Sequence, residues 1–298
     1  MLVVGLIGIA TGVSGASTKP GTAKQVAALV AAAPSIKRLP KDLTPPLASA
    51  NEDNAYLATP SLHSCTTGSP NLPACVYGDT HGSHTMVLFG DSHAFMWFPA
   101  VDAIAKAAKW KLVALMSFGC PVADVTVWNI ATNSANTECP VFRAAMIKRI
   151  DKLNPSLVVV TEGFFTIDAN KRPITDPEWT TALEKSLAAL HSHSMKKVLI
   201  GNTMLIATPN ECLTVNPTSI QTCSRPENTT TFVHQRAAEQ AAAKEQRVPY
   251  VNEIPWTCSA TCTVVIGNML VYNSPGHLSS TYDTYLSGVL TTALKPSM

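Results

Sequence analysis

The stretch that most constrains the fold is residues 85–94, with the sequence TMVLFGDSHA. Its apolar half, residues 86–89, suits a buried parallel strand, although so short a run is also compatible with a buried helix. Gly90 allows a sharp exit from the strand, and residues 94–109 then carry apolar side chains at helical spacing. The pattern predicts a strand, a tight turn and a helix N-terminus, with Ser92 at the carboxyl edge of a sheet.

Ser92 in this position has two interpretations. In one, Asp91 or Ser92 only caps the following helix. In the other, Ser92 is a nucleophile beside the first free N–H groups of the helix, which form part of an oxyanion hole. A short motif is weak evidence alone, but the far end of the chain favours catalysis. There, a loop with Pro275 and Gly276 places His277 just before an amphipathic C-terminal helix.

The composition is that of a folded protein. The chain has 298 residues, 46% of them hydrophobic and 14% charged, enough for one large α/β domain or two small ones. The net charge of +2 and the scattered basic residues give no electrostatic case for a nucleic-acid partner.

Strand-like and helical segments alternate along the chain. We expect further strands over residues 111–116, 157–160, 197–201 and 248–252, and helices over 24–33, 138–153, 180–193, 230–246 and 279–294. This alternation predicts an α/β sandwich with a mainly parallel sheet. Catalytic groups in such folds lie beyond the carboxyl ends of the strands. Ser92 follows the first strand and His277 precedes the last helix, so both can reach that edge.

The eight cysteines fall as near neighbours in sequence. By proximity we pair Cys65 with Cys75, Cys120 with Cys139, Cys212 with Cys223, and Cys258 with Cys262. The two close pairs that zinc requires are absent. Local disulfides indicate an oxidising compartment, and the alternative is reduced, buried cysteines in a cytosolic protein.

The N-terminus agrees with export. Residues 2–13 are apolar and residues 14–17 are small (SGAS), which is typical of a signal peptide, although the basic start is missing. The alternative is the end of a transmembrane helix from a longer protein. Both place the remainder outside the cytoplasmic membrane. We expect residues 18–62 to be an extension with a proline-rich linker, and residues 63–298 to be the domain.

Together these motifs resemble an SGNH hydrolase domain, in particular the extracytoplasmic SGNH domain fused to bacterial, especially actinobacterial, membrane acyltransferases of the type-3 family. The similarity rests on residues 75–79, 87–94 (with Gly-Asp-Ser-His-Ala), 119–121, 197–201 and 271–278, on Tyr282, and on the loop cysteines.

The resemblance implies a three-layer α/β/α sandwich in which Ser92 is the acyl nucleophile and His277 the general base. The N–H groups of Ser92 and Gly119 are oxyanion donors by this reading. His93 either contacts substrate or buttresses the turn, and Asp91 is a further candidate for substrate contact.

Two positions depart from the family pattern. Ser274, with Asn273 beside it, stands where the family has an aspartate three residues before the histidine. A hydroxyl or a backbone carbonyl then orients the imidazole, or a carboxylate such as Asp283 is borrowed. Residues 161–164 (TEGF) lack the oxyanion asparagine, and the Gly163 N–H is a possible replacement.

The resulting expectation is an O-acyltransferase, often of acetyl groups, or an esterase that acts on envelope polysaccharides or glycolipids. It works through an acyl-Ser92 intermediate without metal or organic cofactor. Its partners would be the glycan acceptor, an acyl donor and a membrane acyltransferase domain. The alternative is a catalytically weakened SGNH-like domain that binds glycan or serves as a scaffold.

Overall fold

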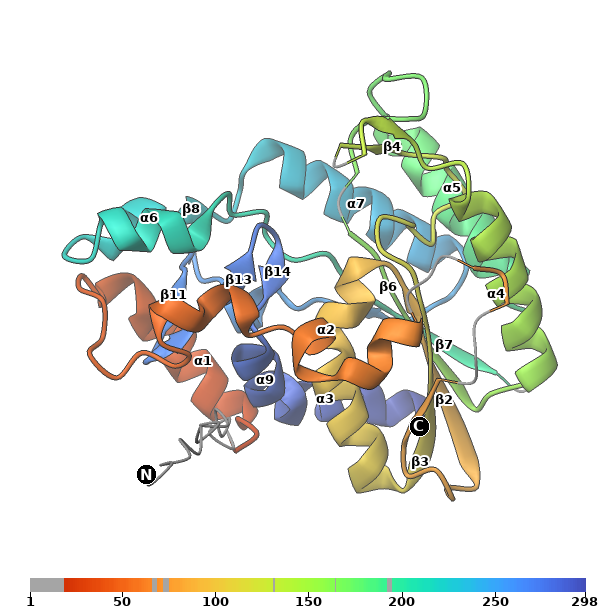
Figure 1. Ribbon diagram of the computed structural model, residues 1–298, viewed down its shortest axis with the longest axis horizontal. Helices are drawn as coiled ribbons and strands as arrows, with labels where there is room; N and C mark the ends of the chain where they lie inside the picture. Colours follow the sequence, from red (N-terminus) through yellow and green to blue (C-terminus); the bar gives the residue numbers. More distant parts are fainter. Residues whose placement is uncertain (1–18, 66–68, 72–74, 131, 164, 192–194) are drawn as a thin grey trace, which may run out of the picture.

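A six-stranded sheet forms the centre of the computed structural model, which describes residues 19–298 except 66–68, 72–74, 131, 164 and 192–194 (Figure 1). The order is β1-β3-β2-β6-β7-β9, with β1 antiparallel and the other strands parallel. The strands are β1 (Val76–Gly78), β2 (His84–Gly90), β3 (Trp110–Met116), β6 (Leu157–Thr161), β7 (Lys196–Ile200) and β9 (Tyr250–Val251). The predicted mainly parallel sheet is confirmed.

Side chains of β2 alternate between two hydrophobic cores. Met86 and Leu88 belong to the core on one face of the sheet, whereas Val87 and Phe89 belong to the core on the other. Because successive residues of a strand point to opposite faces, an uninterrupted apolar run requires cover on both sides.

Two groups of helices, one on each face of the sheet, supply that cover and form the two outer layers. Helices α3 (Ser92–Ala108) and α9 (Ser280–Leu294) contribute to the first core, and α4 (Cys139–Leu153), α5 (Asp176–Ala189) and α7 (Thr230–Glu245) to the second. Figure 1 shows α3 on one side of the sheet and α4 and α5 on the other. The predicted three-layer α/β/α sandwich is therefore confirmed.

The predicted helix boundaries agree with the structure to within two residues except at α5, which begins and ends four residues before the expected positions 180 and 193. The reason for the earlier start is a capping box in which Thr175 accepts a hydrogen bond from the Glu178 N–H and Glu178 accepts one from the Thr175 N–H. Two N–H groups that a helix start leaves unpaired are thereby satisfied.

Short elements connect and cover the two cores. The helices are α1 (Ala23–Ala32), α2 (Ala55–Ala58), α6 (Pro209–Val215) and α8 (Ile254–Thr257), with 3₁₀ turns η1 (Ala33–Ser35), η2 (Leu47–Glu52), η3 (Pro60–Cys65), η4 (Ile220–Cys223) and η5 (Lys295–Ser297). The two-stranded pairs are β4 (Trp128–Asn129) with β5 (Ser134–Ala135), β8 (Arg225–Pro226) with β10 (Thr261–Cys262), β11 (Val265–Ile266) with β12 (Met269–Leu270), and β13 (Tyr272–Ser274) with β14 (His277–Leu278).

The segment before residue 63, expected to be an extension and linker, packs into the first core. Val26, Val30, Leu43 and Leu62 are buried there. Helix α1 contacts α8 and α9, and α2 contacts α3; Figure 1 shows α2 beside α3. The predicted helix at 24–33 is confirmed as α1. The signal-like residues 1–17 lie outside the described part of the chain. Among the described residues, no helix has the length and apolar character needed to cross a membrane.

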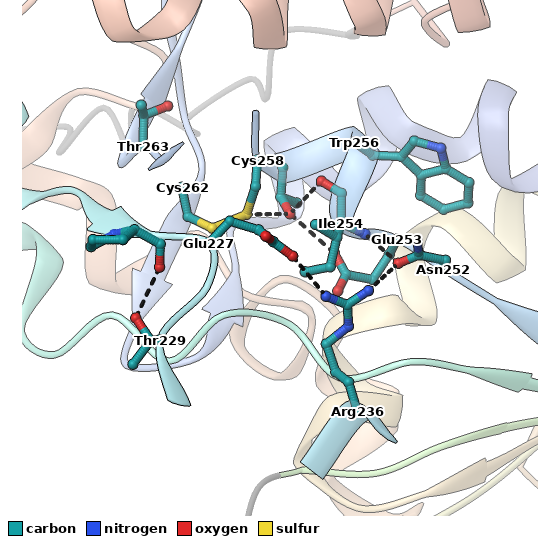
Figure 2. Close-up of a disulfide and its surroundings, with 12 residues drawn as sticks. Glu227, Thr229, Arg236, Asn252, Glu253, Ile254, Trp256, Cys258, Cys262 and Thr263 are labelled. Atoms are coloured by element: carbon teal, nitrogen blue, oxygen red, sulfur yellow. Dashed lines mark hydrogen bonds and ion pairs between the residues drawn. A yellow bond between two sulfur atoms is a disulfide. The ribbon is translucent and has the colours of Figure 1, made fainter. Parts of the chain in front are cut away.

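All four predicted disulfides are present: Cys65–Cys75, Cys120–Cys139, Cys212–Cys223 and Cys258–Cys262. Figure 2 shows the last of these, which ties the end of α8 to β10. Beside it, Arg236 of α7 donates to Glu227 at 3.1 Å and to Asn252 at 2.7 Å. Arg236 thus joins α7 to the loop before it and to the loop that follows β9.

Removal of the N-terminal segment should destabilise the protein strongly. A chain that begins at residue 63 uncovers the pocket filled by four buried Val and Leu side chains, each worth about 1.5–3 kcal/mol, against a total stability of roughly 5–15 kcal/mol. We expect a molten or aggregated product by circular dichroism and dye binding. A chain that begins at residue 19, which keeps every described residue of the N-terminal segment, is the control. Equal melting temperatures for the two would contradict the assignment.

The disulfides should differ in their contribution to stability because they close loops of different length. Cys120–Cys139 spans 19 residues and Cys258–Cys262 spans 4, so loop-closure entropy predicts losses of about 3 and about 2 kcal/mol respectively. Chemical denaturation of the two Cys→Ser double variants measures the difference. A non-reducing peptide map is the companion test, and a map with any other pairing would refute the four bridges.

Candidate active site

Ser92 is the first residue of α3, directly beyond the carboxyl end of β2. Strand β2 lies between β3 and β6, where the connections switch from one side of the sheet to the other, which is where α/β proteins place their sites. Gly90 is required because a Cβ at this position would lie 1.9 Å from the Thr161 carbonyl oxygen of β6. The close approach of β2 and β6 thus fixes where the chain turns toward Ser92.

Asp91 fastens this turn. Its Oδ1 accepts the His93 N–H at 2.9 Å, which caps α3, and its Oδ2 accepts the Gly163 N–H at 2.7 Å. Burial raises the pKa of the Asp91 carboxyl to about 7. The prediction of Gly163 as an oxyanion donor is wrong, because its N–H is bonded to Asp91. Asp91 is fully buried and holds two turns together rather than contacting substrate.

His277 is presented by a hairpin. It pairs with Ser274 across β13 and β14, and the turn between them contains Gly276 at φ +71°, a left-handed conformation that favours glycine. His277 Nδ1 lies 2.8 Å from the Pro275 carbonyl oxygen. Because a carbonyl only accepts, Nδ1 carries the proton and Nε2 is the basic nitrogen. Burial lowers the pKa of His277 below its ordinary value of 6.5, which favours the neutral imidazole that a general base requires.

The His93 ring packs against the imidazole of His277. The His93 and His277 ring centroids are 4.9 Å apart in an edge-to-face arrangement. His93 is only 4% exposed, and burial, followed by the nearby His277, lowers its pKa well below the ordinary value. His93 is not among the residues that line the cavity described next. Of the two predicted roles, the structure favours the buttress.

Ser92 and His277 line one cavity of about 410 Å³. The predicted meeting of two distant parts of the chain is therefore present. The other lining residues are Asn51, Asn54, Ala55, Tyr56, Leu57, Phe95, Met96, Phe118, Asn273, Ser274 and Leu278.

The predicted orienting side chains do not hold the imidazole. The Ser274 hydroxyl donates to Asn273 Oδ1 at 2.8 Å, and Asn273 Nδ2 donates to the Asp53 carbonyl at 3.0 Å. Asp283 is also excluded: it is fully buried, and its Oδ2 accepts the Ala100 N–H at 2.8 Å, one residue beyond Pro99 in α3. The Pro275 carbonyl orients His277 instead, one of the alternatives that the sequence left open.

The remaining oxyanion candidates are the N–H groups of Ser92 and Gly119. Ser92 is at the first position of α3, where N–H groups have no intrahelical acceptor. Gly119 adopts φ +65° in the turn after β3, its carbonyl accepts from Asn136 at 2.9 Å, and its neighbour Phe118 lines the cavity. Gly119 keeps its predicted role as a candidate.

Sequence reasoning missed the contribution of the N-terminal segment. Asn51, Asn54, Tyr56 and Leu57 come from the part expected to be a linker, yet they form a wall of the cavity. The Asn54 side chain caps α2 by accepting the Leu57 N–H at 2.9 Å. A capping asparagine was the only local signal, and it says nothing about where α2 packs.

Residues 63–291 match the family model described as "SGNH domain (fused to AT3 domains)". This match covers well over half of the chain, so the protein belongs to that family of SGNH domains. The sheet topology and the cavity shared by Ser92 and His277 agree with this family. Among proteins with curated descriptions, none matches the chain.

Solved structures share the fold at low sequence identity. The periplasmic domain of a lipopolysaccharide acetyltransferase from Salmonella ser. Paratyphi A aligns with a TM-score of 0.54 and 14% identity, over 70% of this chain and 82% of that one. A GDSL-like lipase from Bacteroides thetaiotaomicron aligns with a TM-score of 0.45 and 14% identity, over 72% and 89% of the two chains. A putative acylhydrolase from Bacteroides fragilis has a TM-score of 0.45 and 14% identity, over 82% and 98%.

Three buried glutamates lie near the same edge of the sheet. Glu162 follows β6, Glu253 follows β9, and Glu239 is on α7; each is 1% exposed. In each, Oε1 has no hydrogen-bond partner among the described residues. Burial raises the pKa of Glu239 to about 7, of Glu253 to about 8, and of Glu162 well above its ordinary value. No three metal-ligating side chains in the described ranges are placed to share an ion.

These carboxyls should make the folded state less stable as the pH rises from 6.5 to 8.5. A carboxyl with a raised pKa keeps its proton in the folded state to a higher pH than in the unfolded state. Its contribution to the stability of the fold is therefore complete below its ordinary pKa and is lost as the pH rises through its pKa in the folded state. His93 and His277 have lowered pKa values, so they reduce the stability of the folded state only below pH 6.5. We therefore expect a loss of about 2 kcal/mol or more and a fall in Tm of about 4 °C or more.

Thermal melts of the wild type, Glu253→Gln and Glu245→Gln across this range provide the test. Glu253→Gln should flatten the slope, because the amide cannot ionise and the pKa of Glu253 lies near 8, whereas the exposed Glu245→Gln should keep it. A wild-type Tm that is constant or rises over this range would contradict the prediction.

Proposed function

We propose that the protein is an extracytoplasmic SGNH-type O-acyltransferase or esterase that acts on cell-envelope glycans or glycolipids through an acyl-Ser92 intermediate. The observation that carries this proposal is the shared cavity of Ser92 and His277, with the His277 Nδ1 proton held by the Pro275 carbonyl. A hydroxyl at a helix N-terminus and an imidazole with a free Nε2 are the two groups that acyl transfer requires.

In the proposed reaction, His277 Nε2 takes the proton of the Ser92 hydroxyl as Oγ attacks the acyl carbonyl carbon. The N–H groups of Ser92 and Gly119 donate to the oxyanion that forms. Collapse of this intermediate breaks the bond to the leaving group, which takes the proton from His277. A sugar hydroxyl or water then gives its proton to His277 and attacks the acyl-Ser92 carbonyl carbon. The bond between this carbon and Ser92 Oγ breaks, Oγ takes the proton back from His277, and the acyl group leaves on the acceptor.

The neutral Pro275 carbonyl replaces the carboxylate of a triad. It fixes the tautomer of His277, and a wrong tautomer is what makes loss of the carboxylate cost about 10⁴-fold. It brings no full negative charge to stabilise the imidazolium. The arrangement therefore supports a Ser-His dyad that is slower than a full triad. A non-catalytic glycan-binding or scaffolding domain, the alternative from the sequence, is the opposite outcome of the test below.

The location and partners are supported by chemistry and by the relatives. Four disulfides favour an oxidising compartment. The family occurs fused to AT3 domains, which supports a membrane acyltransferase as the source of acyl groups. The Salmonella structure is described as part of a lipopolysaccharide acetyltransferase, which supports an envelope glycan or glycolipid as acceptor. The proposed steps use only Ser92, His277 and backbone N–H groups, without a cofactor or a nucleic-acid partner.

A serine-reactive fluorophosphonate and a chromogenic acyl ester test this function. We expect labelling of the wild type at Ser92, and ester hydrolysis that falls about 10³-fold or more in Ser92→Ala and His277→Gln, because the two side chains act as a unit. The exposed Ser259→Ala and His81→Gln variants are matched controls and should retain the wild-type rate. A wild type that is neither labelled nor hydrolytic would establish the non-catalytic domain.

A further inference from the structure

The cavity shared by Ser92 and His277 has a polar part and an apolar part. The polar part comprises Asn51, Asn54, Asn273, Ser274 and His277, and the apolar part comprises Tyr56, Leu57, Phe95, Met96 and Phe118. Members of each part contact one another, Tyr56, Phe95 and Phe118 on the apolar side and Asn273 and Ser274 on the polar side, which indicates two subsites with different ligands.

The apolar part begins at the nucleophile. Phe95 and Met96 follow Ser92 on α3 by three and four positions, so they share its helix face. Phe118 stacks on Phe95 with ring centroids 4.3 Å apart, and the Tyr56 ring meets Phe118 edge-on at 5.3 Å. A group bonded to Ser92 Oγ therefore lies along an apolar wall.

The polar part contains the base. The Ser274 hydroxyl donates to Asn273, and Asn210 Nδ2 donates to the Asn51 side chain and to the Asn273 carbonyl. These bonds join the N-terminal segment to the hairpin that carries His277. An acceptor hydroxyl must reach His277 Nε2, so the hydroxyl-rich acceptor takes the polar part and leaves the apolar part to the acyl group.

An acetyl group is small for the apolar part of the cavity. Seven of the thirteen residues that line the 410 Å³ cavity are apolar or aromatic, and at about 30 Å³ per methylene, the volume of a water molecule in the liquid, half of the cavity holds roughly six or seven carbons. Leu57 and Phe118, 51% and 45% exposed, form its outer end. An acetyl group would leave these side chains in contact with water.

We propose that the acyl group carried by Ser92 is a medium-length aliphatic chain of about six carbons, longer than the acetyl group expected from the family. This inference rests on the proposed function, because it requires Ser92 to be acylated. Each methylene that enters the apolar part should raise kcat/KM about two- to fourfold, until the chain passes Leu57 and Phe118.

A series of 4-nitrophenyl esters from acetate to dodecanoate tests the chain length, with fluorophosphonate labelling of Ser92 run in parallel. The variants are Leu57→Ala and Phe118→Ala, whose half-exposed side chains can be removed with little effect on folding, and Val141→Ala, an exposed control on α4. Melting temperatures confirm that each variant is folded.

We expect kcat/KM to peak near hexanoate or octanoate, and Phe118→Ala to lower the octanoate value about 10-fold while acetate changes less than twofold. Val141→Ala should match the wild type throughout. A labelled wild type that prefers acetate would overturn the chain-length inference and leave the proposed function intact, as would a Phe118→Ala loss equal for all esters, which would assign the wall to the acceptor. Absence of labelling and of hydrolysis at every length would overturn both.

Discussion

The site depends on the two hydrogen bonds that the carboxylate of Asp91 accepts. This carboxylate joins the turn after β2 to the turn after β6 through the N–H groups of His93 and Gly163, while Gly90 lets the two strands approach within contact. These bonds set the direction of α3 and so the position of Ser92. Because Asp91 is fully buried, its two hydrogen bonds offset much of the cost of its desolvation. Asp91, which the sequence suggested as a substrate contact, instead holds in place the turn that leads to Ser92.

The histidine is organised by backbone rather than by an acid. The Pro275 carbonyl fixes the tautomer of His277, and the buried His93 ring packs against it. Both rings are kept neutral by burial, which suits a base that must accept a proton. The site therefore combines a well-positioned imidazole with weak electrostatic support for its charged form.

The cavity is assembled from parts that are far apart in sequence. Residues of the N-terminal segment, of α3, of the turn after β3 and of the β13–β14 hairpin all line it. The N-terminal segment has a double role, since its Val and Leu side chains fill the first core while Asn51, Tyr56 and Leu57 shape the site. Changes in this segment would alter specificity and stability together.

The sequence by itself determined the sandwich and the four disulfides, and it predicted Ser92 and His277 as the catalytic pair, which the structure places in one cavity. These follow from local information: apolar runs with two-sided cover, loop cysteines near one another, and a Gly-Asp-Ser turn before a helix. Only the tertiary structure decided what each neighbouring polar group bonds. Gly163 donates to Asp91, Ser274 donates to Asn273, and Asp283 accepts from α3, because hydrogen-bond partners depend on which distant segments pack together. For the same reason, only the structure showed that residues 51–57 form part of the site, since nothing local in this stretch specifies the surface that it covers.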